Sequence, residues 1–251
     1  MKKGIQENRN SRNLARLIGF AIICLALLSV GKIFQAIPEK PAAKPFIRTK
    51  AEFIDEAGKD PSFREFREQL LIALQKKDLK FLMEHVDNGI RVSFDGPQGI
   101  EGFMKNWGLI LEPEKSEIWI ELPIILKLGS GFAENNKTAV GFPNDQSKYP
   151  DTIQDYQQTA IIATDVPVYS APDPKSQVID KLSWEIVRLQ TFEMAPSATK
   201  NGMKIPWAKI EIYSGKIGYV DEKFVYNAWG LRGSFQNKNG IWKMTTLIAG
   251  D

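Results

Sequence analysis

The sequence predicts an α+β fold in which a mainly helical region and a C-terminal β-hairpin form one split domain. A small β-barrel is inserted between these two parts, and a signal or anchor helix precedes them. Three observations support this fold class: an uncharged apolar run follows a basic N-terminus, apolar residues recur at helical spacing over 53–129, and short alternating segments broken by turn residues follow. The chain has 251 residues, enough for one or two modest domains after a leader.

The N-terminus predicts export. Five basic residues, Lys2, Lys3, Arg9, Arg12 and Arg16, precede the uncharged run 17–30. This run of about 14 residues is shorter than the roughly 20 that a helix needs to cross the hydrocarbon, unless the next residues extend it, and small residues at its end would suit a signal peptidase. We therefore expect residues 1–37 to be either a cleaved signal peptide or a retained anchor in the inner membrane. In both cases the remainder is periplasmic or faces outward from the cytoplasmic membrane.

Charge and cysteine content exclude several function classes. The whole chain has a formal net charge of +3, and residues 1–30 alone have a net charge of +4. The exported part therefore has a net charge of −1. A charge this close to zero predicts no nucleic-acid partner. The single cysteine, Cys24, lies inside the apolar run, so the exported part has neither a disulfide nor a thiol nucleophile. Residues 38–52 contain three prolines and several lysines and are predicted to form a semi-extended linker.

The region 53–150 is predicted to be mainly helical and to form the first part of the α+β domain. A capping box from Ser62 to Glu65 would start one helix, with Phe63 and Phe66 on its apolar stripe, and Asp78 would cap a second. A short strand is expected at 90–94 and a helix near 100–107. A last helix is expected from Ser116 to a stop at Gly129, with a kink or a late start at Pro123.

Residues 158–226 have the pattern of a small β-barrel. Val166 and Val168 alternate before an Ala-Pro-Asp-Pro turn, a Val-Ile pair begins the next strand at 178, and Trp207 begins Trp-Ala-Lys-Ile. Gly-Lys-Ile-Gly-Tyr-Val closes the pattern at 215–220. This order resembles the bacterial SH3 (SH3b) domain. The family commonly has Arg where this chain has Tyr169 and Gly where it has Ala171, which leaves any inherited ligand preference open.

Residues 227–251 predict a hairpin that completes the α+β domain. Two alternating strands flank Asn-Lys-Asn-Gly at 237–240, and an isolated hairpin is marginal in water, so we expect it to pack on the early helices. The final strand also resembles, locally, that of NTF2-like and cystatin-like α+β domains. As a whole the chain resembles exported bacterial proteins that contain an SH3 domain, a resemblance that implies an architecture and no activity.

The sequence predicts no catalytic residue, metal site or cofactor. His85 is the only histidine and is expected to be an ordinary surface or helix-end residue. The carboxylates at 55–56 and 112–117 are expected to lie on solvated faces, because nothing in the sequence makes two of them converge. No nucleophile elbow and no phosphate-binding loop is present.

The aromatic residues of the predicted barrel are the best candidates for binding. They are Tyr169, Trp184, Trp207 and Tyr219. SH3-like folds present aromatic side chains along a groove that holds an extended peptide. Strand alternation favours the core or the groove wall for Trp207 and Tyr219, whereas Tyr169 and Trp184 lie near turns and are expected to be more exposed.

Two functions from different classes follow. The first is a non-catalytic cell-envelope binding protein whose SH3-like barrel contacts peptidoglycan peptide or a protein partner. The second is an NTF2-like small-ligand-binding or enzymatic domain with the barrel as an accessory module, in which an apolar cone would enclose a polar group such as Asp95, Glu101 or His85. A core filled by Phe94, Phe103, Trp107 and Trp242 would exclude that cone.

Overall fold

The computed structural model describes residues 45–96, 98–134, 136–200 and 203–250, with the backbone alone at 194–200 and 203–205. Within these residues the chain is a mixed α+β protein with two β-sheets and few helices, which confirms the predicted class. The predicted signal or anchor, 1–37, and the first part of the linker lie outside the described residues. Among the helices that are described, none combines the length and the apolar character that a membrane span requires.

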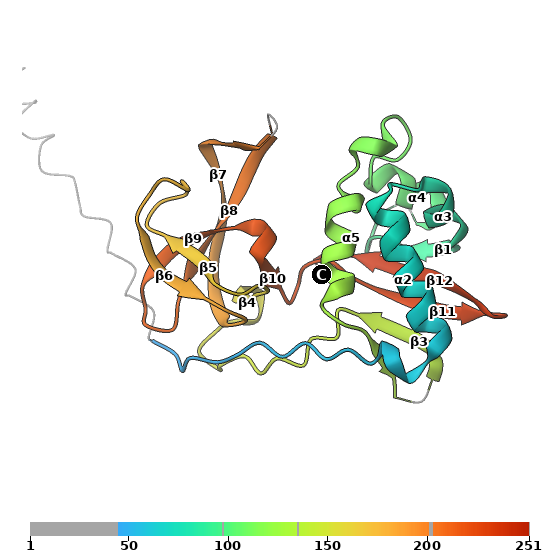
Figure 1. Cartoon of the computed structure of the whole chain (residues 1–251), viewed down its shortest axis with the longest axis horizontal. Coiled ribbons are helices and arrows are strands. Elements are labelled where there is room, and N and C mark those ends of the chain that lie inside the picture. The colour runs from blue at the N-terminus through green and yellow to red at the C-terminus, as the bar shows by residue number, and fades with distance from the viewer. Residues whose placement is uncertain (1–44, 97, 135, 201–202, 251) are drawn as a thin grey trace, which may run out of the picture. The chain divides into compact units, whose positions relative to one another are not determined.

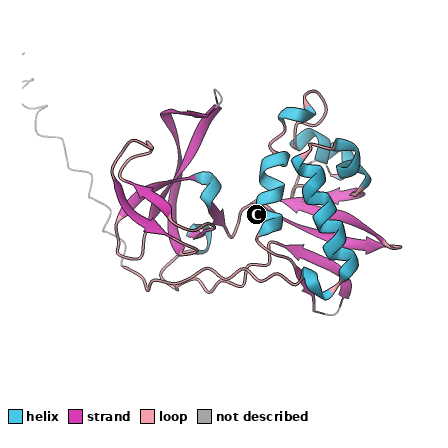
Figure 2. Cartoon of the chain, viewed as in Figure 1, coloured by secondary structure: helices cyan, strands magenta, loops and turns pink. Residues whose placement is uncertain are grey.

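The α-helices of the described residues lie with one of the two sheets (Figures 1 and 2). The α-helices are α2 (Pro61–Gln75), α3 (Leu79–Glu84), α4 (Gly99–Asn106) and α5 (Ile118–Lys127). Two 3-10 turns accompany them, η1 (Ala57–Lys59) and η2 (Pro113–Lys115), whereas η3 (Asp155–Gln157) and η4 (Glu222–Phe224) adjoin strands of the other sheet.

A five-stranded sheet carries these helices. Its strands are β1 (Val86–Arg91), β2 (Gly131–Ala133), β3 (Asn136–Phe142), β11 (Arg232–Lys238) and β12 (Ile241–Ile248), in the order β1-β12-β11-β3-β2. The β1 strand runs parallel to β12 and the other pairs are antiparallel. The final two strands therefore lie between β1 and β3, which come much earlier in the chain.

Asn239 and Gly240 form the turn of the terminal hairpin, which confirms the predicted hairpin. Both have positive φ, 56° and 86°, as the tight turn between two antiparallel strands requires. The Asn237 side chain accepts a hydrogen bond from the Gly240 amide and closes the turn.

The start of α2 differs from the predicted capping box. Asp60, not Ser62, is the N-cap: its carboxylate accepts hydrogen bonds from the amides of Ser62 and Phe63. Pro61 takes the first helical position, where a missing N–H costs nothing, and this moves the start of the helix two residues upstream. The prediction that Asp78 caps the next helix is confirmed, since its side chain accepts from the Phe81 amide.

The first strand also differs from its predicted position. It covers 86–91 and not 90–94, because its partner is β12 and the pairing begins where the Met244 amide donates to the His85 carbonyl. Ile90 and Val92 are buried, as alternation predicts, but Phe94 has left the sheet and is 39% exposed. The last helix begins at Ile118, two residues after the predicted start, with Pro123 inside it.

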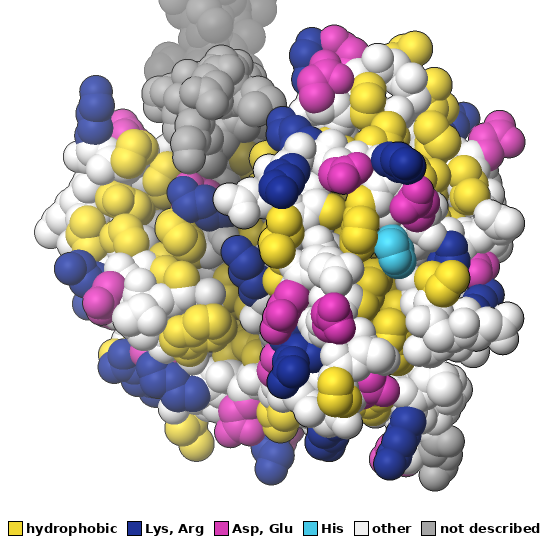
Figure 3. All heavy atoms as spheres, turned by 45° about the vertical axis from the view of Figure 1, so that its right-hand side comes forward, with side chains coloured by type: hydrophobic (Ala, Val, Ile, Leu, Met, Phe, Trp, Pro, Cys, Tyr) yellow, Lys and Arg dark blue, Asp and Glu magenta, His cyan; other side chains and the backbone are white. Residues whose placement is uncertain are grey.

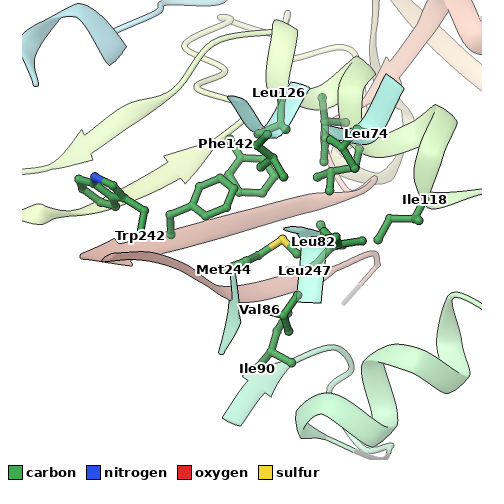
Figure 4. Close-up of a cluster of buried hydrophobic side chains, with 14 of the residues drawn as sticks. Leu74, Leu82, Val86, Ile90, Ile118, Leu126, Phe142, Trp242, Met244 and Leu247 are labelled. Atoms are coloured by element: carbon green, nitrogen blue, oxygen red, sulfur yellow. The ribbon is translucent and has the colours of Figure 1, made fainter. Parts of the chain in front are cut away.

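One apolar core joins the helices to this sheet (Figure 4). Leu74 and Leu82 come from helices α2 and α3, Ile118 and Leu126 from α5, and Trp242 and Met244 from β12. Phe103 of α4 and Trp242 are both buried in this core.

The seven-stranded sheet contains β4 (Gln158–Ile161), β5 (Val166–Tyr169), β6 (Val178–Leu182), β7 (Ile186–Lys200), β8 (Met203–Glu211), β9 (Ile217–Asp221) and β10 (Val225–Asn227). Their order is β10-β4-β7-β8-β9-β5-β6. Although β4 and β6 stand near opposite ends of this order, Ile161 and Leu182 belong to one buried cluster. The sheet must therefore curl strongly, because a flat sheet would hold these two strands far apart.

Two glycines allow the β8–β9 part of this sheet to form. Gly215 turns the chain with φ 81°. At Gly218 an added Cβ would lie 2.4 Å from a methyl carbon of Val168 and 3.0 Å from the carbonyl oxygen of Tyr169, so only glycine lets β9 approach β5.

Candidate functional site

Three neighbouring strands of the seven-stranded sheet bring Trp207, Tyr219 and Tyr169 to one face. Tyr219 of β9 stands opposite Tyr169 of β5 and opposite Lys209 of β8. Trp207 lies two residues before Lys209 and so shares its face. The rings of Tyr169 and Trp207 meet edge to face with their centroids 5.5 Å apart. We call Tyr169, Trp207 and Tyr219 the aromatic face.

Trp207 forms the floor of the aromatic face. It is 3% exposed, and the two half-buried tyrosines pack against it. Its indole Nε1 is buried and finds no hydrogen-bond partner among the described residues. An unsatisfied buried donor costs about 1–3 kcal/mol. A ligand carbonyl that reached this N–H, once a tyrosine had turned aside, would recover that cost.

Charged groups stand beside the aromatic face. The Lys209 ammonium lies 5.6 Å from the centroid of the Tyr219 ring and 3.3 Å from a carboxylate oxygen of Glu193. Both side chains of this ion pair are about one-third exposed. The pair can therefore exchange partners with a charged group of a ligand at small cost.

Trp184, the fourth predicted residue, lies elsewhere. It has φ 54° in the turn before β7, its ring packs edge to face against Phe53 at 6.3 Å, and its Nε1 donates to Thr164 Oγ1. It is 37% exposed, as its place near a turn predicts. The structure brings three of the four predicted aromatic residues together and separates this one from them.

The same side of β8 continues into a buried ion pair that the sequence did not predict. Arg188 Nη1 lies 2.6 Å from Glu211 Oε1, and both side chains are 4% exposed. Arg188 also donates to the Thr152 carbonyl and lies over the Phe46 ring, while Gln190 donates to the other Glu211 oxygen. Flanking segments near residues 46 and 152 thus cover this part of the sheet and leave the Trp207 end as the candidate site.

A second buried carboxylate, Glu185, holds the linker on the same sheet. Arg48 and Lys50 both donate to its Oε1, and the Ile186 amide donates to the Thr49 carbonyl. Burial alone would raise the pKa of Glu185, but the hydrogen bonds from the two cations outweigh it and hold that pKa below its ordinary value.

The polar residues proposed for an NTF2-like cone do not converge. Asp95 and Glu101 are exposed. His85 caps the end of α3, stacks on Phe81 at 4.3 Å and places its Nδ1 2.9 Å from the Phe81 carbonyl oxygen. It reaches the surface among side chains of both charges (Figure 3). Phe103 and Trp242 fill the core where the cone was expected, although Phe94 and Trp107 do not.

A cavity of about 600 Å³ lies beside this core. Its lining includes Glu121, which the sequence did not identify as a candidate site residue. Its walls come from the ends of α4, β11 and β12, the η2 turn and the first turn of α5, and they include Trp107, Glu117 and Glu121. Burial, with the nearby charges of Glu117 and Glu222, raises the pKa of Glu121 to about 7. The sequence does not show that this carboxylate is partly buried or that its pKa is raised. Both depend on the strands that pack beside the start of α5.

We expect Glu121→Gln to stabilise the protein at pH 8 and to leave its stability unchanged near pH 4. The folded pKa of about 7 exceeds the ordinary value of 4.5, so the folded state keeps the proton longer and stability falls as pH rises between these values. The full shift corresponds to about 3 kcal/mol, which partial exposure reduces to about 1–2 kcal/mol. Urea unfolding at the two pH values measures the difference. Glu114→Gln, an exposed neighbour, is the matched control, and an equal effect of both variants at pH 8 would contradict the assignment.

Comparison with protein-family models, with curated proteins and with solved structures finds no match to this chain. Among the residues that the structure describes, no group of three or more His, Cys, Asp or Glu side chains is placed to hold a metal ion. The function of the chain is therefore inferred from its own residues.

Proposed function

We propose that this chain is a non-catalytic binding protein of the bacterial cell envelope. Residues 158–226 act as an SH3-like barrel inserted into a split α+β domain, and the N-terminal segment exports the protein or anchors it facing outward. The ligand is an extended peptide, first a stem peptide of peptidoglycan and second a segment of a protein partner. The observation that carries the proposal is the aromatic face, in which the Trp207 indole N–H has no hydrogen-bond partner among the described residues.

The chemistry of this face suits an extended peptide. Flat aromatic rings beside a buried donor offer apolar contact to the chain of a peptide and one hydrogen bond to a backbone carbonyl. Lys209, whose partner Glu193 is partly exposed, supplies a cation for a free carboxylate, a group that stem peptides carry. Tyr169, which stands where the SH3b family has Arg, adds apolar surface in place of a charge.

We expect the full-length chain to sediment with purified cell-wall sacculi and Tyr169→Ala/Tyr219→Ala to bind at least about tenfold more weakly. Each lost aromatic contact is worth about 0.5–1.5 kcal/mol. Tyr156→Ala removes a tyrosine that is 66% exposed and lies outside the aromatic face, so it is the matched control. Trp184→Ala is expected to behave like that control, because Trp184 lies apart from the other three.

Sacculi stripped of their stem peptides by an amidase separate the peptide from the glycan. Loss of binding on stripped sacculi supports the stem peptide as ligand. Binding that persists on bare glycan strands, or a double variant that sediments like the wild type, would contradict the proposal. If intact sacculi do not retain the wild type, the peptidoglycan ligand is wrong and only a protein partner remains.

A further inference from the structure

Both apolar and acidic residues line the cavity beside the five-stranded sheet. The larger apolar residues are Val92, Trp107, Leu231 and Leu247. The acidic residues are Glu117 and Glu121 at the start of α5, together with Glu112. Among the described residues of the lining, Lys115 is the single basic one, and it is already ion-paired with Glu112.

Two carboxylates of this cavity have no cationic partner among the described residues. Within the described part of the chain, neither Glu117 nor Glu121 makes a side-chain hydrogen bond or an ion pair, whereas ten other ion pairs form in that part. The two are four residues apart, so they are neighbours on one side of the helix start. Glu121 is half-buried, and an unpaired carboxylate in such a position lowers stability unless a positive charge approaches it.

The shape and lining of the cavity select the kind of cation. Its volume of about 600 Å³ falls within the range of small-molecule sites, roughly 300–1,000 Å³. A bare metal ion would leave the apolar lining residues without a contact, and two monodentate carboxylates are few ligands for a metal ion. The half-buried Trp107 provides a ring on which an apolar group, or the cation itself, can rest.

We propose that this cavity binds a small primary ammonium compound that carries an apolar group. The ammonium group lies between the carboxylates of Glu117 and Glu121, and the apolar group lies against Trp107. This site is independent of the aromatic face, so either proposal can fail without the other.

The test follows binding of 2-(4-fluorophenyl)ethylamine to the full-length chain by ¹⁹F NMR. Its uncharged counterpart, 2-(4-fluorophenyl)ethanol, has nearly the same shape and isolates the contribution of the charge. We expect the amine to bind about ten- to a hundredfold more tightly than the alcohol, the range of one charge-assisted hydrogen bond. Amine and alcohol of equal affinity, or an amine that does not bind at millimolar concentration, would overturn the proposal.

Variants locate the site. Glu121→Gln is expected to weaken amine binding at least about tenfold and to leave alcohol binding unchanged, while Glu114→Gln, which removes the same charge from an exposed neighbour outside the lining, changes neither. Trp107→Leu is expected to weaken binding of both compounds. Equal effects of Glu121→Gln and Glu114→Gln would show general attraction by negative charge and would refute the site.

The pH dependence gives a second readout. Glu121 is faced by Glu117 on its own helix and by Glu222 of η4, and the lining also holds the paired Glu112 and Lys115. Because the amine stays protonated below about pH 9, its affinity should rise between pH 6 and pH 8 as Glu121 loses its proton. Affinity that is constant over this interval in the wild type would contradict the role of Glu121.

Discussion

Arg188→Met is expected to destabilise the protein by about 3–5 kcal/mol, the cost of leaving one partner of a buried ion pair alone. Glu211 would keep its carboxylate at 4% exposure and would retain only the hydrogen bond from Gln190. The bond from Arg188 to the Thr152 carbonyl and the contact with the Phe46 ring would be lost as well. Urea unfolding, followed by tryptophan fluorescence, measures the change in free energy.

The double variant Arg188→Met/Glu211→Leu separates the cost of a lone charge from the value of the pair. We expect it to recover most of the lost stability, because two apolar side chains of similar size remove both charges from the interior. Lys59→Met, which breaks the exposed pair with Glu56, is the control and should cost less than about 1 kcal/mol. An Arg188→Met variant as stable as this control would contradict the burial of the pair.

Local signals in the sequence predicted the helices and the hairpin. The side chain of Asp78 reaches an amide three residues later, and Asn239-Gly240 adopts the positive φ that a tight turn needs. Such features depend on the residues beside them and not on the rest of the chain. The predicted capping box at Ser62 was wrong: Asp60 followed by Pro61 starts α2, because the fixed φ of proline suits the first helical position.

Features that depend on distant partners could not be placed from the sequence. The first strand is displaced because β12, about 150 residues later, sets its register by parallel pairing. Helical spacing could not show that Glu121 would be half-buried beside the ends of β11 and β12. The burial of Arg188 and Glu211 was likewise not predicted, because charged residues are mostly exposed and only the segments that fold over β7 and β8 bury these two.

The sequence predicted which aromatic residues form the candidate binding site, but it predicted only part of their arrangement. Strand alternation placed Trp207 in a wall or core, and it is the buried floor of the aromatic face. Pairing between β5 and β9 decides that Tyr169 and Tyr219 stand opposite one another, and a single residue pair makes that contact. Trp184 has a left-handed backbone in the turn before β7, and its ring lies apart from the aromatic face. The spacing of apolar residues in the sequence does not predict such a turn.

Phe63→Ala is expected to cost about 3–5 kcal/mol, a large share of the roughly 5–15 kcal/mol that stabilises a domain. Phe63 is fully buried, and its ring contacts those of Phe66, Phe132, Phe235 and Trp242, with centroids 4.9–6.2 Å apart. These partners come from α2, β2, β11 and β12, so removing the ring leaves a void between helix and sheet. Urea unfolding gives the loss, and near-UV circular dichroism reports the packing of the remaining aromatic rings.

Two variants on the same helix make the result specific for core packing. Ile72→Ala removes an apolar side chain that is 52% exposed and should cost less than about 1 kcal/mol, because it leaves no enclosed void. Phe63→Leu retains most of the volume and should fall between the two. If Phe63→Ala and Ile72→Ala cost the same, the ring does not hold α2 to the five-stranded sheet.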